Sequence, residues 1–215
     1  MICVSLREPD HAAFVRALDG LRADMAEIRL DGASLSGAEV ESLFSRPMPL
    51  IAAFRPTEGV SDEERTAVLG AAVRAGARFV DIELESALHF GGALIPSARA
   101  RGCKIIISHH DDIATPDRPR LDELVEACFA AGGDIAKIAC RVRTRADCAR
   151  LLSLYESGRP VIALGMGRQG LITRVAAPLL GAPFTYASAD GGRPTADGQI
   201  EWSRMRDLLA LLEGR

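Results

Sequence analysis

The chain has 215 residues, of which 48% are hydrophobic and 26% are charged, and its formal net charge is −3 at pH 7. This composition is typical of a folded globular protein and argues against intrinsic disorder. The slightly acidic balance lacks the basic surface by which proteins bind nucleic acid or anionic membranes. No apolar run reaches the roughly 20 residues that span a bilayer. We therefore expect neither a nucleic acid nor a membrane as partner.

The N-terminal residues have the pattern of a strand and not of a secretory leader, because apolar residues begin at once. The cysteines form no CxxC pair and are odd in number: Cys3, Cys103, Cys128, Cys140 and Cys148. We expect buried free thiols rather than disulfides or zinc ligands, and a cytoplasmic protein.

Eight short runs of apolar or β-branched residues recur along the chain and predict strands. They are Ile2–Leu6, Met25–Leu30, Pro49–Phe54, Phe79–Leu84, Lys104–Ser108, Ile135–Cys140, Val161–Leu164 and Phe184–Ser188. Stretches with apolar residues three and four apart predict helices between or after them. These stretches are His11–Leu21, Asp62–Ala75, Ala87–Arg101, Leu121–Ala131, Arg145–Tyr155, Leu171–Leu180 and Trp202–Leu212.

Alternation of strand and helix favours a parallel sheet with helical crossovers. Eight such units predict an α/β protein with one (β/α)8 TIM barrel, and a doubly wound open sheet is the alternative. No Pro-, Gly- or Ser-rich linker divides the sequence, so we expect residues 1–215 to form a single domain.

In a (β/α)8 barrel the chemistry lies at the carboxyl ends of the strands. Charged or imidazole side chains end nearly every predicted strand, which is more than solvation of single strand ends explains. They include Glu27, Arg29, Asp31, Arg55, Asp81, Glu83, His109, His110, Asp111 and Lys137. Glu27 and Arg29 are two residues apart, so both can point into the mouth of the barrel.

Lys137 is unusual because it lies within an apolar strand, where a charge is costly. The chain has 26 basic residues, and only Lys104 and Lys137 are lysine. Arginine cannot lose its proton in a protein, whereas a lysine in a desolvated pocket near other cations can, and it then attacks carbonyls to form a Schiff base. Arg29, Arg55 and Arg174 are candidates for those cations. The alternative is an outward lysine whose ammonium reaches solvent between helices.

The neighbours His109 and His110 must point to opposite sides of their strand, so at most one faces the mouth. A histidine beside a Schiff-base lysine is expected to shuttle protons. A metal site made by His109, His110, Asp81 and Glu83 is the weaker alternative, because the spacing matches no known ligand motif. We therefore expect no metal.

The segment Gly165–Gly170, GMGRQG, has the spacing of a dinucleotide-binding loop. It follows the seventh predicted strand, however, whereas that fingerprint normally belongs to the first βαβ unit. A glycine-rich turn that presents backbone and Arg174 to an anionic substrate is the favoured interpretation. No cofactor is expected.

Taken together, the motifs resemble those of the type I 3-dehydroquinate dehydratase family. The resemblance runs from the first strand to the last helix. It rests on E-x-R-x-D (Glu27 to Asp31), F-R with E-G (Phe54-Arg55, Glu58-Gly59), D-x-E (Asp81, Glu83), S-x-H-D (Ser108 to Asp111), I-x-K-I-A (Lys137), M-G-x-x-G-x-x-T-R (Met166 to Arg174) and A-x-G-Q (Ala196 to Gln199). Two departures stand out: the loop after Arg55 is one residue shorter than is common in the family, and Asp197 replaces a common proline.

The resemblance implies an enzyme that eliminates water from 3-dehydroquinate to give 3-dehydroshikimate in the shikimate pathway. It implies that Lys137 forms an imine with the C3 ketone and that His110 is the general base. Glu58 would orient or tune His110, and Asp81 would support it from behind.

For substrate binding, the resemblance implies that Arg174 holds the carboxylate. Glu27, Arg29 and Arg55 would bind the ring hydroxyls, while Thr195 and Gln199 would close over the substrate. It also implies a homodimer with a small-molecule substrate and no metal or cofactor. Another Schiff-base lyase or aldolase on the same barrel, and a non-catalytic ligand-binding barrel, remain as alternatives.

Overall fold

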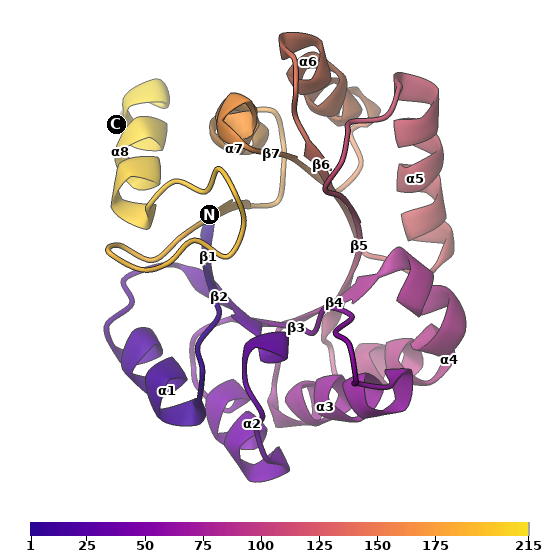
Figure 1. Ribbon diagram of the computed structural model, residues 1–215, viewed down its shortest axis with the longest axis vertical. Coiled ribbons are helices and arrows are strands. Elements are labelled where there is room, and N and C mark those ends of the chain that lie inside the picture. Colours follow the sequence, from indigo (N-terminus) through magenta and orange to yellow (C-terminus); the bar gives the residue numbers. More distant parts are fainter. Residues whose placement is uncertain (215) are drawn as a thin grey trace.

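The computed structural model describes residues 1–214, except for the side chains of residues 90 and 91. Eight strands form one sheet that curves into a ring with helices outside it (Figure 1). The strands are β1 (Ile2–Leu6), β2 (Met25–Arg29), β3 (Leu50–Ala53), β4 (Phe79–Glu83), β5 (Lys104–Asp111), β6 (Ile135–Arg141), β7 (Val161–Met166) and β8 (Thr185–Ala187). The α-helices are α1 (His11–Asp19), α2 (Gly37–Phe44), α3 (Asp62–Ala75), α4 (Leu84–Ala100), α5 (Arg118–Ala130), α6 (Arg145–Ser153), α7 (Leu171–Leu179) and α8 (Trp202–Leu212).

All ladders in the sheet are parallel, and the strand order is β7-β6-β5-β4-β3-β2-β1-β8. The pairing of β1 with β8 brings the two ends of the chain together and nearly closes the barrel. Within residues 1–214, no ladder joins β7 to β8. The predicted TIM barrel is therefore confirmed, with one incomplete seam.

The sequence prediction missed helix α2, which begins in a capping box. Ser36 accepts a hydrogen bond from the amide of Glu39, and the Glu39 carboxylate accepts one from the amide of Ser36. Val40, Leu43 and Phe44 are buried against the sheet. The S-x-x-E pattern was a visible signal for this helix, although its eight residues are too short to show clear periodicity.

Strand β5 is three residues longer than predicted and ends at Asp111. His109 and His110 therefore lie within the ladder, opposite Ile138 and Ala139 of β6. This position fixes the two imidazoles on opposite faces of the sheet, because side chains alternate along a strand.

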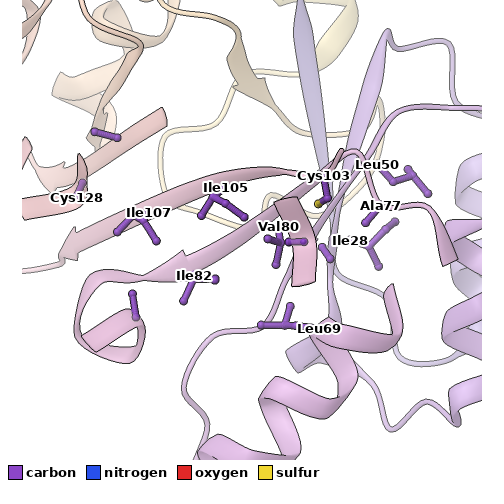
Figure 2. Close-up of a cluster of buried hydrophobic side chains, with 14 of the residues drawn as sticks. Ile28, Leu50, Leu69, Ala77, Val80, Ile82, Cys103, Ile105, Ile107 and Cys128 are labelled. Atoms are coloured by element: carbon purple, nitrogen blue, oxygen red, sulfur yellow. The ribbon is translucent and has the colours of Figure 1, made fainter. Parts of the chain in front are cut away.

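Two apolar layers surround the strands. The larger layer lies between the sheet and the helices, and Figure 2 shows part of it around Ile28, Val80 and Ile105. The second layer fills the interior of the barrel with Cys3, Met25, Ile51, Ile106, Ile135, Ile162, Leu164, Phe184 and Tyr186.

Along five strands, the inward-facing side chains change from apolar to polar between one inward position and the next. Two residues after an interior apolar residue, each of these strands places a buried polar one. The pairs are Cys3 with Ser5, Met25 with Glu27, Phe79 with Asp81, Ile106 with Ser108, and Ile135 with Lys137. Since the side-chain period of a strand is two, the polar residues form a layer directly above the apolar plug. This layer is the base of the site described below.

Candidate active site

A cavity of about 560 Å³ opens at the carboxyl ends of the strands. Eight of the ten residues predicted for the site line it: Glu27, Arg29, Arg55, His110, Lys137, Arg174, Thr195 and Gln199. Asp81 is buried just beneath it, in contact with Lys137. Glu58 is the exception.

Lys137 lies at the base of the cavity, where its side chain is only 6% exposed. Its Nζ lies 2.8 Å from Oδ2 of Asp81 and 3.2 Å from Oε2 of Glu27. The ring of Tyr186 supports the ammonium from below, with Nζ 4.2 Å from the ring centroid. Arginines were expected beside this lysine, but the groups in contact with its ammonium are two carboxylates and an aromatic ring. The amine lies buried at the base of an open cavity, where a carbonyl substrate could reach it.

Asp81 links three of the cavity's polar groups. Besides Lys137, it accepts a hydrogen bond of 2.6 Å from the Ser108 hydroxyl and lies 3.4 Å from Nη2 of Arg55. Burial alone would raise the pKa of Asp81, but the cations of Arg55 and Lys137 outweigh burial and hold that pKa well below its usual value. Asp81 is therefore a fixed anion that positions Lys137.

Glu27 is the second anion beside the lysine. Its Oε1 accepts a 2.5 Å hydrogen bond from Ser5, while Oε2 faces Lys137. Burial opposes ionisation here too, yet Lys137 lowers the pKa of Glu27 below its usual value. Both oxygens are thus engaged, one with a hydroxyl and one with the ammonium.

His110 lies above this layer, with Nδ1 3.2 Å from Nη1 of Arg55 and 3.5 Å from Oε1 of Glu83. Burial, together with the charges of Arg55 and Lys137, lowers the pKa of His110 well below its usual value. The imidazole is therefore neutral near pH 7 and can accept a proton. His109 contacts a separate small pocket beside Glu83, Leu84 and Glu85. Among the described residues, no group of three or more His, Cys, Asp or Glu is arranged to hold a metal ion.

Glu58 does not reach His110 in this structure. It lies in the loop after β3, where its side chain is exposed, and it is absent from the residues that line the cavity. Glu83 of β4 lies against the imidazole instead. Strand β4 holds Glu83 toward the mouth, whereas the loop after β3 carries the Glu58 side chain into solvent.

Arg174 is a buried cation that forms no ion pair with the described residues. It is 2% exposed, lines the cavity, and has no ion-pair partner within 4.0 Å among residues 1–214. Its Nε has no hydrogen-bond partner in that range of the chain. Burial lowers the pKa of Arg174 to about 10, and nearby Asp197 only partly offsets this effect. A guanidinium in such a position is suited to bind a carboxylate from the cavity.

The glycine-rich segment before α7 is a tight turn rather than a dinucleotide loop. A Cβ on Gly170 would lie 2.4 Å from the carbonyl carbon of Gly165, so these two backbones touch. Gly167 has a φ of 85°, which favours glycine. The turn brings Arg174, in the first part of α7, to the edge of the cavity.

The segment between β8 and α8, residues 188–201, forms one wall of the cavity and is called the lid here. Thr195 donates a 2.8 Å hydrogen bond to Ser5, and Arg141 forms an ion pair with Asp197. The Gly167 amide donates to the Asp197 carbonyl. Figure 1 shows this gold segment beside β1. The lid is thus held at β1, at β6 and at the turn that follows β7.

Four residues of the site were not predicted as catalytic or substrate-binding residues: Ser5, Glu83, Ser108 and Tyr186. Glu83 had been considered only as a ligand in the metal alternative. Glu83 and Ser108 belonged to quoted motifs, and strand parity could have placed all four inside the barrel. What the sequence could not supply was which of their polar atoms meet.

Comparison with known proteins places this geometry in a family. The profile described as type I 3-dehydroquinase matches residues 2–215. The chain is 37% identical to a 3-dehydroquinate dehydratase of Desulfotalea psychrophila, covering 97% of this chain and 96% of that protein. It is 34% identical to one of Thermococcus gammatolerans, with 90% of each covered. A solved 3-dehydroquinate dehydratase of Geobacillus kaustophilus superposes with a TM-score of 0.87 at 25% identity, covering 99% and 91% of the two chains.

A match to nearly the whole chain, on a barrel that carries a buried lysine, a neutral histidine and an unpaired arginine in one cavity, leads to a single conclusion: the chain belongs to the type I 3-dehydroquinase family.

Proposed function

We propose that this chain is a 3-dehydroquinate dehydratase, a hydro-lyase that converts 3-dehydroquinate to 3-dehydroshikimate through an imine on Lys137. The observation that carries the proposal is the position of Lys137, enclosed at the base of a cavity that also contains His110 and the unpaired Arg174. Family membership favours this reaction over that of an aldolase or a non-catalytic barrel.

The proposed reaction begins when the Lys137 ammonium releases a proton and the resulting amine attacks the C3 carbonyl. That proton and one from the nitrogen leave with the carbonyl oxygen as water, which gives an iminium. The iminium withdraws electrons more strongly than the ketone, so neutral His110 can remove a proton from C2 and form an enamine. The enamine then expels the C1 hydroxyl, which takes the proton from His110 and departs as water. Hydrolysis of the imine releases the conjugated product and restores the amine.

The histidine needs one nitrogen free to act as base. Arg55 can only donate, so its Nη1–H at 3.2 Å makes Nδ1 the acceptor and places the ring hydrogen on Nε2; the lone pair that can take a proton is then that of Nδ1. We assign to Glu83 the orienting role that the family resemblance gave to Glu58, because Glu83 is the carboxylate within reach. Asp81 keeps its predicted supporting role, acting on Lys137 and on Arg55.

Substrate binding is assigned by charge and position. Arg174 pairs with the substrate carboxylate, which supplies its missing anion. Glu27, Arg29 and Arg55 bind the ring hydroxyls, and Thr195 and Gln199 of the lid close the cavity above the ring. Within the cavity wall Gln199 also accepts a 2.8 Å hydrogen bond from the amide of Thr195, which supports the lid's shape.

The test combines two measurements on purified protein. Addition of dehydroquinate should produce the ultraviolet absorbance of a conjugated enone, and borohydride added during turnover should attach one ligand mass to Lys137. Lys137→Ala should lose both signals. Lys104→Ala is the matched control and should keep them, because Lys104 is exposed at the start of β5, the end away from the cavity. Label on Lys104, or turnover by Lys137→Ala, would remove the mechanism.

We also propose that the protein is a cytoplasmic homodimer. All five cysteines are buried free thiols, which suits a reducing compartment. Helices α7 and α8 expose Ile172, Leu179, Leu208 and Leu211, with Leu211 75% exposed. Apolar side chains gathered on adjacent helices suit an interface between subunits. Within residues 1–214 no helix has the length and apolar character to cross a membrane.

A further inference from the structure

A continuous chain of hydrogen bonds runs from the lid to the lysine. Gln199 Nε2 lies 3.1 Å from Thr195 Oγ1, and Thr195 Oγ1 lies 2.8 Å from Ser5 Oγ. Ser5 Oγ lies 2.5 Å from Oε1 of Glu27, whose other oxygen faces Lys137 Nζ at 3.2 Å. Four contacts therefore connect two lid residues with the amine proposed to form the imine.

The donors and acceptors in this series of hydrogen bonds can be assigned in only one way. Glu27 is ionised, since its pKa is lowered, so its oxygens only accept hydrogen bonds. Ser5 must then donate its single hydroxyl hydrogen to Glu27, which leaves it to accept from Thr195. Thr195 in turn donates its hydroxyl hydrogen to Ser5 and accepts a hydrogen bond from the side-chain amide of Gln199. Each group has its hydrogen directed toward Glu27.

Ser5 connects the two parts of this hydrogen-bonded series, because it belongs neither to the lid nor to the Glu27–Lys137 ion pair. It is 2% exposed and extends from β1 into the polar layer of the barrel. Its hydroxyl occupies one oxygen of Glu27 and so turns the other oxygen toward Lys137. Seating of the lid fixes the orientation of that hydroxyl through Thr195.

We infer that Ser5 is a positioning residue that couples seating of the lid to the placement of Glu27 against Lys137. The inference rests on the proposed function, in which Lys137 forms the imine. A lid seated over bound substrate then also aligns the counter-ion of the lysine, so imine formation is favoured when the cavity is closed to water.

A double-mutant cycle tests this coupling. Ser5→Ala and Thr195→Val are made singly and together, and the rate of imine formation is measured at saturating dehydroquinate by timed borohydride quenching and mass spectrometry. Saturation removes the separate effect of Thr195 on substrate affinity. Ser5→Ala should slow trapping about tenfold or more, as expected for a lost hydrogen bond to a charge. Thr195→Val should slow it several-fold in wild type but less than twofold in Ser5→Ala.

Two further variants make the result decisive. Ser86→Ala is the matched control, because Ser86 is a buried serine that accepts a hydrogen bond from Arg65 outside the cavity, and it should leave the trapping rate unchanged. Ser5→Cys keeps a weak donor and should fall between wild type and Ser5→Ala; it also replaces Ser5→Ala in the cycle if thermal melting shows that the alanine variant is unfolded.

The outcomes separate the inference from the proposed function. If wild type traps no substrate on Lys137, the proposed function is wrong. If wild type traps substrate and the two substitutions multiply independently, Ser5 does not transmit the state of the lid. Loss of the Thr195 effect in the Ser5→Ala background supports the coupling.

Discussion

The two buried cations of the cavity, Lys137 and Arg174, differ in their ion pairing. Lys137 lies between two carboxylates, whereas Arg174 has no anionic partner within residues 1–214. Burying an unpaired charge destabilises a fold, so such a residue is retained for what it binds. The contrast supports different roles: the lysine is held in place by the protein, and the arginine is completed by the substrate.

The unpaired arginine predicts that activity and stability change in opposite directions. Arg174→Met removes a buried, unpaired charge, so the free energy of unfolding should rise by about 1–3 kcal/mol while turnover is lost. Arg29→Met is the matched control and should destabilise the protein, because it leaves buried Asp31 without its two-pronged partner. Urea unfolding of both variants at pH 7 measures the difference. A less stable Arg174→Met protein would mean that interactions within the free enzyme already offset the cost of burying the guanidinium.

The two candidate partners of His110 can be separated by substitution. Glu83→Gln removes the carboxylate that holds Arg55 against Nδ1 and should reduce kcat by roughly tenfold to a hundredfold, since the imidazole is then oriented less firmly. Glu58→Gln changes an exposed loop side chain and should leave kcat within about twofold of wild type. Steady-state kinetics decide between them. The reverse ranking would show that the loop after β3 moves inward during the reaction.

The depressed pKa of His110 also predicts a pH dependence of stability. A histidine whose folded pKa lies below its usual 6.5 binds its proton more readily in the unfolded chain. Stability should therefore fall as the pH drops below about 6.5, before the carboxylates Glu27 and Asp81 begin to contribute near their ordinary values of 4.5 and 3.8. Urea unfolding between pH 7 and 5 should show this decline, and His110→Asn should flatten it. An equal slope in both proteins would contradict the assignment.

Among the secondary-structure elements, the alternation of side chains along the strands determines which strand residues form the site. Loops and turns determine where Arg174 and the lid residues lie. Ser5, Glu27, Asp81, Ser108 and Lys137 share the polar layer because each lies two residues beyond an apolar plug residue. Arg174 and the lid residues have no such rule, since they reach the cavity through loops. The turn before α7 is the clearest case, because its backbone packs against itself.

That turn predicts a sharp difference between two Gly→Ala substitutions. At Gly170 a methyl group would lie 2.4 Å from the backbone of Gly165, so the turn must shift, with an expected cost of about 1–3 kcal/mol and weaker binding of substrate through displaced Arg174. At Gly37, in the first turn of α2, a methyl meets nothing within 4 Å, and stability should change by less than about 0.5 kcal/mol. Thermal melting and KM measure both effects. A neutral Gly170→Ala would show that the turn relaxes without cost.

For the whole molecule, the fold and the centre of the site could be predicted because both follow from periodicity. Eight strand signals gave the barrel, and a lysine in an apolar strand marked the cavity. The prediction failed where contacts depend on loop length or short elements. Helix α2 was too short for a periodic signal, and the exposed position of Glu58 is set by the course of the loop after β3, which periodicity does not describe. The carboxylate neighbours of Lys137 come from strands far apart in sequence, so only the closed barrel brings them together.

The apolar faces of α7 and α8 lead to a prediction about assembly. If two copies of the chain meet through these helices, a charge in place of one of their exposed leucines should separate the copies, because an unpaired carboxylate cannot be buried in an apolar interface.

Leu211→Glu should therefore reduce the solution mass from that of two chains to that of one. Leu88→Glu is the matched control: Leu88 is 73% exposed, close to the 75% of Leu211, but it lies on α4, away from α7 and α8. Light scattering coupled to size exclusion measures both masses. A wild type with the mass of one chain would exclude the dimer, and a dimeric Leu211→Glu would place the interface elsewhere on the barrel.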